Sequence, residues 1–206
     1  EGGASFNPEN LRYWELLPER LVYIISIDPA SSDAKEADDQ VICVMGFSSR
    51  DVYLVEYTAH KGEMPDAAVV TLIQYIRTYK PICIISESVS YQRVLAWYVE
   101  QEMKRSRLYV AVHRVDDRRR KADRIMQAIG GATGQGKLLV KSTHFKFLDQ
   151  YATYSPLAKM HDDVLDAVAM GLDYAQSLSI EDWIEGDYTN VTEEDKPRRL
   201  EFRQCP

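Results

Sequence analysis

Two hydrophobic runs, each ending at an acidic residue, constrain the fold of this chain more than any other feature. Residues 21–27 read LVYIISI and stop at Asp28, and residues 81–86 read PICIIS and stop at Glu87. Runs that are apolar at nearly every position are typical of central strands in a sheet covered on both faces. We therefore predict an α/β fold with Asp28 and Glu87 at the ends of two central strands.

The rest of the chain contains the patterns of further strands and helices. Residues 40–47 and 51–58 are strand-like and follow the first strand as a meander. The expected sheet is therefore mixed and has five strands or slightly more, with helices on both faces. Helical spacing of hydrophobic residues predicts helices at 65–79, 91–104, 117–129, 145–151 and 161–177, with a fifth strand at 108–112 and a short extra strand at 137–141.

The chain is long enough for one sizeable domain with extensions. Its 206 residues are 45% hydrophobic, which is sufficient for a single core. Residues 1–20 contain Gly, Asn and Pro and are expected to be an entry linker with at most one helical turn, at 11–14. The domain is expected over residues 21–178, and residues 179–206 are expected to be a loose, charged tail. The abrupt start suggests a fragment of a longer chain.

Composition excludes several classes of protein. No apolar run is long enough to span a bilayer, and the N-terminus does not resemble a signal peptide. Cys43 and Cys83 lie inside strand-like runs and Cys205 lies in the tail, so neither a disulfide framework nor a zinc site is expected. The net charge of −7 argues against a protein that coats nucleic acid, although phosphate contact needs only a local basic patch.

A third group of acidic residues opens the last predicted helix. Asp162 and Asp163 lie in its first turn, and Asp166 follows about one turn later. If the strands that end at Asp28 and Glu87 are parallel neighbours, all of these carboxylates meet at one edge of the sheet. Carboxylate oxygens are the ligands that Mg²⁺ and Mn²⁺ prefer, and two such ions roughly 4 Å apart suit phosphodiester hydrolysis.

Each acidic position also has a purely structural interpretation. Asp28 precedes a proline and is a common type of turn former. Acidic residues in a first helical turn often only favour the helix dipole. It is the order of the three acidic positions along the chain that favours a metal site, and spacing alone does not decide among Asp162, Asp163 and Asp166.

Three motifs in this order of elements carry a resemblance to a known family. With ISIDPA at 25–30, IISES at 84–88 and HDDVLDA at 161–167, the chain resembles the ribonuclease H-like nuclease domain of the tailed-bacteriophage terminase large subunit, in the retroviral integrase-like superfamily. The resemblance implies a metal-dependent endodeoxyribonuclease that cuts concatemeric viral DNA during genome packaging. It gives catalytic roles to Asp28, Glu87 and Asp163, with Asp162 as the alternative third ligand.

The same resemblance implies a cofactor and a set of partners. Two divalent ions, Mg²⁺ or Mn²⁺, would be held by the acidic residues of the three motifs, with Asp166 as a further ligand or a supporting residue. An ATPase domain would precede residues 1–20 in the full-length chain, and double-stranded DNA, the portal and the small terminase subunit would be partners. The host cytoplasm is the expected location. His161 would orient a ligand or cap the helix.

Basic residues gather at the start of the helix predicted after the fifth strand. They are the best candidates for contact with DNA phosphates, although Asp116, Asp117 and Asp123 would equally balance them as an ordinary solvated helix face. The chain contains no base-reading motif, so little sequence specificity is expected. The predicted DNA-contacting residues are Arg118, Arg119, Arg120, Lys121, Arg124 and, further along, Lys137.

A glycine-rich segment imitates a nucleotide-binding motif. Residues 131–137 read GATGQGK, with the glycine and lysine spacing of a phosphate-binding loop. Leu138 replaces the metal-binding Ser or Thr, and a helix pattern precedes the segment where a strand is required. We expect a flexible turn near the active-site face, without ATP binding.

Three alternative functions remain open from the sequence. A junction-resolving nuclease of the same fold would share the acidic cluster. A non-catalytic docking module of a packaging machine would use the cluster only for structure. A nucleotide hydrolase built on residues 131–137 is the weakest of the three, because its motif lacks the required context.

Overall fold

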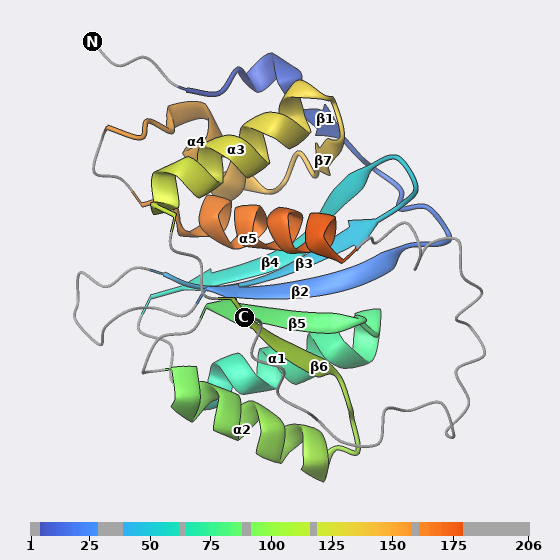
Figure 1. The fold of residues 1–206 in the computed structure, drawn as a ribbon. Helices are drawn as coiled ribbons and strands as arrows, with labels where there is room; N and C mark the ends of the chain where they lie inside the picture. Colours follow the sequence, from blue (N-terminus) through green and yellow to red (C-terminus); the bar gives the residue numbers. More distant parts are fainter. Residues whose placement is uncertain are drawn as a thin grey trace.

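A seven-stranded mixed sheet forms the middle layer of the molecule (Figure 1). The computed structural model describes residues 5–28, 39–61, 65–87, 92–115, 119–157 and 161–178. The order across the sheet is β1-β7-β4-β3-β2-β5-β6, in which β3 is antiparallel to both of its neighbours. The strands are β1 (Arg12–Tyr13), β2 (Val22–Asp28), β3 (Gln40–Phe47), β4 (Val52–His60), β5 (Cys83–Glu87), β6 (Ala111–Val115) and β7 (Leu138–Val140).

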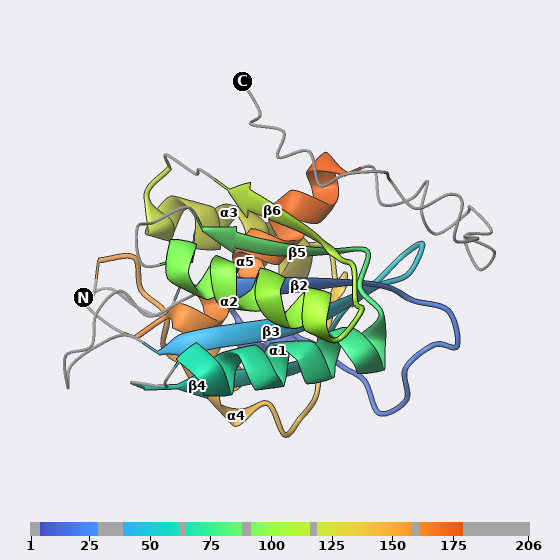
Figure 2. The same ribbon diagram turned by 90° about the horizontal axis from the view of Figure 1, so that it is seen from below.

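Helices cover both faces of the sheet, as the sequence predicts. The 3-10 helix η1 (Pro8–Asn10) precedes β1, and the α-helices are α1 (Pro65–Tyr79), α2 (Gln92–Arg105), α3 (Lys121–Gly134), α4 (Phe145–Thr153) and α5 (Asp163–Ser177). Helices α3, α4 and α5 lie on one face, while α1 and α2 lie on the other, as the view from below also shows (Figures 1 and 2). In the described part of the chain, no helix is both long and apolar enough to cross a membrane.

Alternating residues of the central strands serve two separate cores. Ile24 of β2 and Cys43 of β3 face α5, whereas Ile25 and Val44 face α1 and α2. Because both faces are buried, these strands are hydrophobic at nearly every position, which explains the continuous runs in the sequence. Cys43 and Cys83 are buried free thiols and belong to these strands as small apolar side chains.

Helix α5 packs closely against the sheet. The Ser26 hydroxyl donates a hydrogen bond of 2.7 Å to the carbonyl of Ala167, which ties α5 to β2. A Cβ atom at Gly171 would come within 2.4 Å of the Met45 sulfur, so the helix approaches β3 as closely as a glycine allows. Together these contacts hold α5 against β2 and β3.

The two strands that end at acidic residues are parallel neighbours. In the register between β2 and β5, Ile27 pairs with Ser86, so Asp28 and Glu87 follow at the same end of the sheet. On its other side β2 is antiparallel to β3, where Asp28 pairs with Val41. The condition on which the predicted acidic cluster depends is therefore met.

The N-terminal segment differs from its prediction. The expected helical turn at 11–14 is wrong, because Arg12–Tyr13 pairs in parallel with β7 as an edge strand. Phe6 stacks on Tyr151 with ring centroids 4.9 Å apart, and the Trp14 indole N–H donates a 3.0 Å hydrogen bond to the carbonyl of Leu54. Residues 5–14 thus pack on the domain, because β7 leaves an edge that a short strand can satisfy.

The region after α2 also departs from the prediction. The strand predicted at 108–112 is β6, and it runs over Ala111–Val115 because Cys83, the first residue of β5, pairs with Ala111. Helix α3 starts at Lys121, since Arg120 still has an extended backbone. The expectation of a flexible turn over 131–137 is wrong, because α3 continues through Gly134 and only the following residues turn toward β7.

Candidate metal-binding site

The first turn of α5 presents its acidic side chains to neighbouring cations, not to its own backbone. Asp162 is the N-cap residue but makes no capping hydrogen bond. Instead, the Gln150 side-chain oxygen of α4 accepts hydrogen bonds from the backbone N–H groups of Val164 and Leu165, at 3.1 and 3.2 Å. Because Gln150 caps the helix, the carboxylates of Asp162 and Asp163 are available for other contacts.

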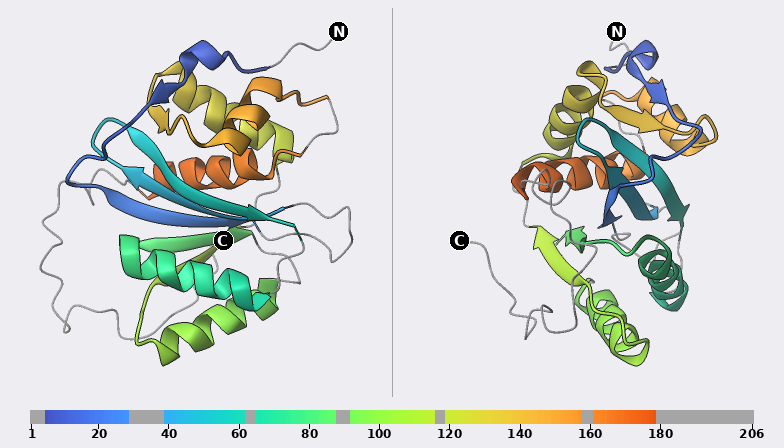
Figure 3. Two further views of the ribbon diagram at one scale, coloured as in Figure 1. Left: turned by 180° about the vertical axis from the view of Figure 1, so that it is seen from behind. Right: turned by 90° about the vertical axis from the view of Figure 1, so that its right-hand side faces the viewer.

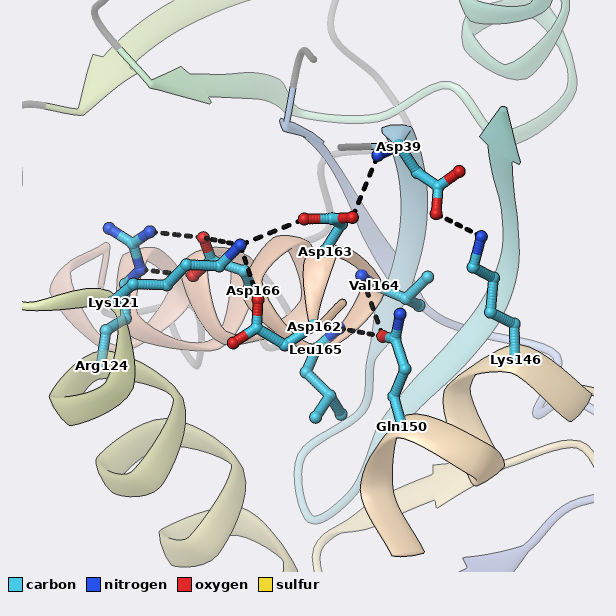
Figure 4. Close-up of polar contacts among 10 residues, drawn as sticks. All are labelled: Asp39, Lys121, Arg124, Lys146, Gln150, Asp162, Asp163, Val164, Leu165 and Asp166. Carbon is cyan, nitrogen blue, oxygen red and sulfur yellow. Dashed lines mark hydrogen bonds and ion pairs between the residues drawn. The ribbon is translucent and has the colours of Figure 1, made fainter. Parts of the chain in front are cut away.

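Lys121, the first residue of α3, lies among these carboxylates (Figure 4). Its Nζ atom is 2.8 Å from Asp162 Oδ1, 3.2 Å from Asp163 Oδ1 and 3.6 Å from Asp166 Oδ2. Burial alone would lower the pKa of Lys121, but the charges of Asp166, Asp28 and Asp162 outweigh it and raise that pKa. The ammonium group is therefore firmly charged and balances the acidic cluster.

Asp163 is anchored by the backbone just before β3. It is buried, with 1% of the residue exposed, and its Oδ2 atom accepts a 3.0 Å hydrogen bond from the backbone N–H of Asp39. Its other oxygen faces Lys121. One oxygen thus anchors the side chain to the start of β3, while the other is directed toward the cation.

Asp166 is engaged by a different cation. The guanidinium of Arg124 donates two hydrogen bonds to its two oxygens, at 2.8 and 2.7 Å, and both side chains are 3% exposed. Such a bidentate buried pair holds both groups in one geometry. Arg124, which the sequence suggested for DNA contact, is placed inside the protein between α3 and α5.

Asp28 and Glu87 complete the acidic edge from the side of the sheet. Asp28 is partly buried at the end of β2 and is close enough to Lys121 for its charge to affect that residue's pKa. Glu87 ends β5, and its side chain lies outside what the structure describes. Within the described residues, no three Asp, Glu, His or Cys side chains are arranged to hold a metal ion as they stand.

The chemistry of the cluster nevertheless fits a hard divalent cation. Its donors are carboxylate oxygens from a strand end and a helix N-terminus, which is the donor type that Mg²⁺ and Mn²⁺ prefer. The same oxygens already surround a cation, the Lys121 ammonium. Asp28, Asp162 and Asp163 are the described residues best suited to hold a metal, because Arg124 already engages both oxygens of Asp166.

Sequence reasoning missed three residues that support the cluster. Asp39 is buried and its carboxylate pairs with Lys146 of α4, while its N–H holds Asp163. Gln150, also on α4, caps α5. Asp39 lies just before the fully buried strand β3, and that position was the only signal for it.

The predicted DNA-contacting residues are distributed over different environments. Arg118 lies outside the described residues. Arg119 pairs with Asp173, and Arg120 is exposed and pairs with Asp123 at 2.7 Å. Lys137 is exposed at the far end of α3, beside β7. Exposed basic groups therefore surround the start of α3, but Lys137 is remote from them.

A small cavity of about 150 Å³ lies beside the cluster. It is bounded by the end of β6, the start of α3 and the second half of α5, and Arg124 separates it from Asp166. Asp162 and Asp163 do not line it.

Comparison with known proteins gives one family and several similar folds. The family model "Terminase Bacteriophage T7, Ribonuclease H-like domain" matches residues 27–138, more than half of the chain. The match includes Asp28, Glu87 and Lys121 but ends before α5. A search of curated proteins finds no match.

Three solved structures illustrate the fold likeness. The large terminase of a thermophilic bacteriophage in complex with ADP has a TM-score of 0.60 and 12% identity over 82% of this chain and 43% of that one. The large terminase nuclease of thermophilic phage G20c with bound magnesium has a TM-score of 0.57 and 13% identity, covering 83% and 97%. The human cytomegalovirus terminase nuclease domain, manganese-soaked and inhibitor-bound, has a TM-score of 0.58 and 15% identity, covering 80% and 89%. The chain spans less than half of the ADP-bound large terminase.

Proposed function

The chain belongs to the family of terminase ribonuclease H-like domains, and from that premise we propose that it is a metal-dependent endodeoxyribonuclease. Its role would be to cut concatemeric viral DNA during genome packaging, with little sequence specificity. The observation that carries the proposal is the carboxylate cluster around Lys121, at the end of β2 and the start of α5.

The proposed metal ligands are the acidic residues at this edge. Asp28, Glu87 and Asp163 would hold two ions, with Asp162 as a further ligand, and Mg²⁺ or Mn²⁺ fits their oxygen donors. When bound, the two ions would activate the attacking water and stabilise the charge of the leaving oxygen. The magnesium and manganese in the phage G20c and cytomegalovirus structures support this choice.

The protein's own residues would keep the cluster ready for the reaction. The Asp39 N–H fixes the orientation of Asp163, and Gln150 satisfies the N–H groups at the start of α5. Arg124 neutralises Asp166, which lowers the repulsion among the neighbouring carboxylates. The positive end of the α5 dipole favours the remaining negative charge.

Double-stranded DNA is the proposed substrate. Arg119 and Arg120 lie at the start of α3, next to the cluster, and would contact phosphates on either side of the cut. Arg118 and Lys137 remain candidates for further contacts. Lys121 is close enough to the carboxylates to approach the phosphate that is cleaved.

The proposed partners follow from the family. An ATPase domain in the same full-length chain is supported by the ADP-bound large terminase, of which this chain covers 43%. The portal and the small terminase subunit would complete the packaging machine. The activity would take place in the cytoplasm of the infected host cell.

Plasmid cleavage tests the proposed nuclease. The chain, its Asp28→Ala variant and a control Asp51→Ala variant are incubated with supercoiled plasmid in Mn²⁺, Mg²⁺ or chelator. Asp51 is also an acidic residue in an ion pair, with Arg12, but it is not part of the acidic cluster. Circular dichroism establishes that all three proteins are folded.

The expected result is cutting that requires a divalent ion and is lost only in Asp28→Ala. Equal cutting by the wild type and Asp28→Ala would contradict the assignment of Asp28 as a ligand. The absence of cutting by the folded wild type under every condition would favour a non-catalytic docking role.

A further inference from the structure

Lys121 contacts the acidic cluster differently from the other cations around it. Arg124 uses two nitrogens for Asp166, and Lys146 pairs with Asp39. The Lys121 ammonium, by contrast, lies within 4 Å of oxygens from three residues, at 2.8, 3.2 and 3.6 Å. One compact charge is therefore shared among the carboxylates that include the proposed metal ligands.

A metal ion and this ammonium compete for the same oxygens. Asp162 Oδ1 and Asp163 Oδ1 both face Lys121, so an ion bound by these atoms would lie where the ammonium now lies. A divalent ion and an ammonium group that contact the same carboxylate oxygens repel one another strongly when they are partly shielded from water. The lysine must therefore move away when a divalent ion binds.

We propose that Lys121 is a built-in counter-ion that holds the carboxylates of Asp162 and Asp163 together before metal binds and is displaced by the incoming ion. The inference rests on the proposed function, because it assumes that these carboxylates are metal ligands. It adds a regulatory consequence: the affinity of the site for metal is set in part by the cost of displacing a residue of α3.

The environment of Lys121 permits this movement. Its side chain is 38% exposed, whereas that of Arg124 is 3% exposed, so of these two cations the lysine has the open path to solvent. A lysine carries its charge on a flexible four-carbon chain, which can reorient without moving the helix. Arg124 would stay on Asp166 and keep α3 attached to α5 during the exchange.

The test compares metal affinity and metal-free stability in matched variants. Binding of MnCl₂ is measured by isothermal titration calorimetry, and the melting temperature is measured in chelator, for wild type, Lys121→Met, Lys121→Arg and Arg12→Met. Arg12→Met removes a cation from the ion pair with Asp51, outside the cluster, and controls for the loss of one positive charge.

We expect Lys121→Met to bind Mn²⁺ about tenfold more tightly than wild type, because the competing charge is gone. Without metal, its melting temperature should fall by about 3–6 °C, because the carboxylates then repel one another. Lys121→Arg should keep the Mn²⁺ affinity of the wild type and its melting temperature in chelator. Arg12→Met should leave the Mn²⁺ affinity unchanged.

Unchanged or weaker Mn²⁺ binding by folded Lys121→Met would overturn the inference while leaving the proposed metal site intact. If Lys121→Met is unfolded in chelator, Lys121→Gln, whose amide still donates to the carboxylates, is measured in its place with the same criterion. A wild-type chain that binds no Mn²⁺ would overturn the proposed function itself, and this inference with it.

Discussion

The two ends of helix α3 each carry a local sequence pattern, a basic run at its start and a glycine-rich segment at its end, yet only the basic run faces the acidic cluster. At its start, Lys121 and Arg124 contact the carboxylates of α5. At its end, Gly131 and Gly134 belong to the helix, and Lys137 precedes the edge strand β7. The two ends are roughly 20 Å apart at the rise of an α-helix, and Figure 3 shows the helix from behind and from the side.

The difference shows that a local pattern acquires its chemistry from the end of the helix on which it lies. A phosphate-binding loop uses the free N–H groups and positive dipole of a helix N-terminus. The glycine-rich segment lies at a C-terminus, where free carbonyls and the negative end of the dipole repel phosphate. At the other end, Lys121 and Arg124 form ion pairs with the acidic residues at the start of α5. These basic residues therefore help to hold α3 against α5 and also balance the acidic charge.

The largest effect is expected from Arg124→Met, which tests whether the start of α3 is a structural anchor. The change removes both Arg124 hydrogen bonds from the buried Asp166 carboxylate, which the Lys121 ammonium at 3.6 Å does not replace, and should lower the free energy of unfolding by about 3–5 kcal/mol. Urea denaturation measures the loss. Adding Asp166→Leu should restore most of it, because the uncompensated charge is then removed; a double variant as unstable as the single one would contradict this explanation.

The next effect concerns the carboxylates that face this end of α3. Asp163→Asn should reduce metal-dependent plasmid cleavage by more than about 100-fold, because it removes the charge from a buried ligand that the Asp39 N–H anchors. Asn still accepts the hydrogen bond from the Asp39 N–H, so the fold is retained. Asp162→Asn, at a more exposed position, is expected to cost less, and the reverse order would assign the principal role to Asp162.

A smaller effect of opposite sign is expected at the far end of α3. Gly131→Ala places a Cβ where no atom lies within 4 Å, inside a helix. It should raise the free energy of unfolding by about 0.5–1 kcal/mol, since alanine loses less conformational entropy in a helix. Cleavage should be unaffected. A loss of cleavage in this stable variant would show that the glycines have a functional role, and that both ends of α3 contribute to cleavage.

The smallest effect concerns DNA affinity along the helix. Arg120→Gln should weaken binding of a labelled duplex by roughly threefold and reduce the salt dependence by about one counterion. Fluorescence anisotropy in chelator measures binding without cleavage. Lys137→Gln, at the opposite end, should change neither quantity. An equal loss in both variants would extend the DNA contact over the whole of α3.

Much of the fold could be predicted because hydrophobic periodicity reports burial directly. The α1 boundaries agree with the prediction, and β3 matches residues 40–47. The shifted strand β6 and the edge strand β1 could not be placed, because pairing partners decide where an edge strand begins. For α3, the helix continued through glycines that the sequence marks as a turn, because tertiary packing overrides weak local propensity.

The candidate site could be predicted only in its acidic half. Asp28, Glu87 and the α5 carboxylates stand at strand and helix ends, which a sequence pattern reveals. Asp39, Lys146 and Gln150 support the cluster from elements distant in the chain. The position of Asp39 just before the buried strand β3 is a local signal, but nothing local distinguishes the other two. Arg124 could not be separated from its exposed neighbours, because its burial depends on how α3 packs against α5.

By itself, the sequence determined the alternation of strands and helices and the positions of the acidic residues at their ends. Hydrophobic periodicity, and the points where an apolar run stops, are set by residues adjacent in the chain. Only the tertiary structure decided which cations meet those acids. Lys121 and Arg124 are each far from their partners in the chain, 42 residues apart in the pairs Lys121–Asp163 and Arg124–Asp166. The side-by-side packing of α3 and α5 gives one of these cations a shared, partly exposed position and the other a buried one.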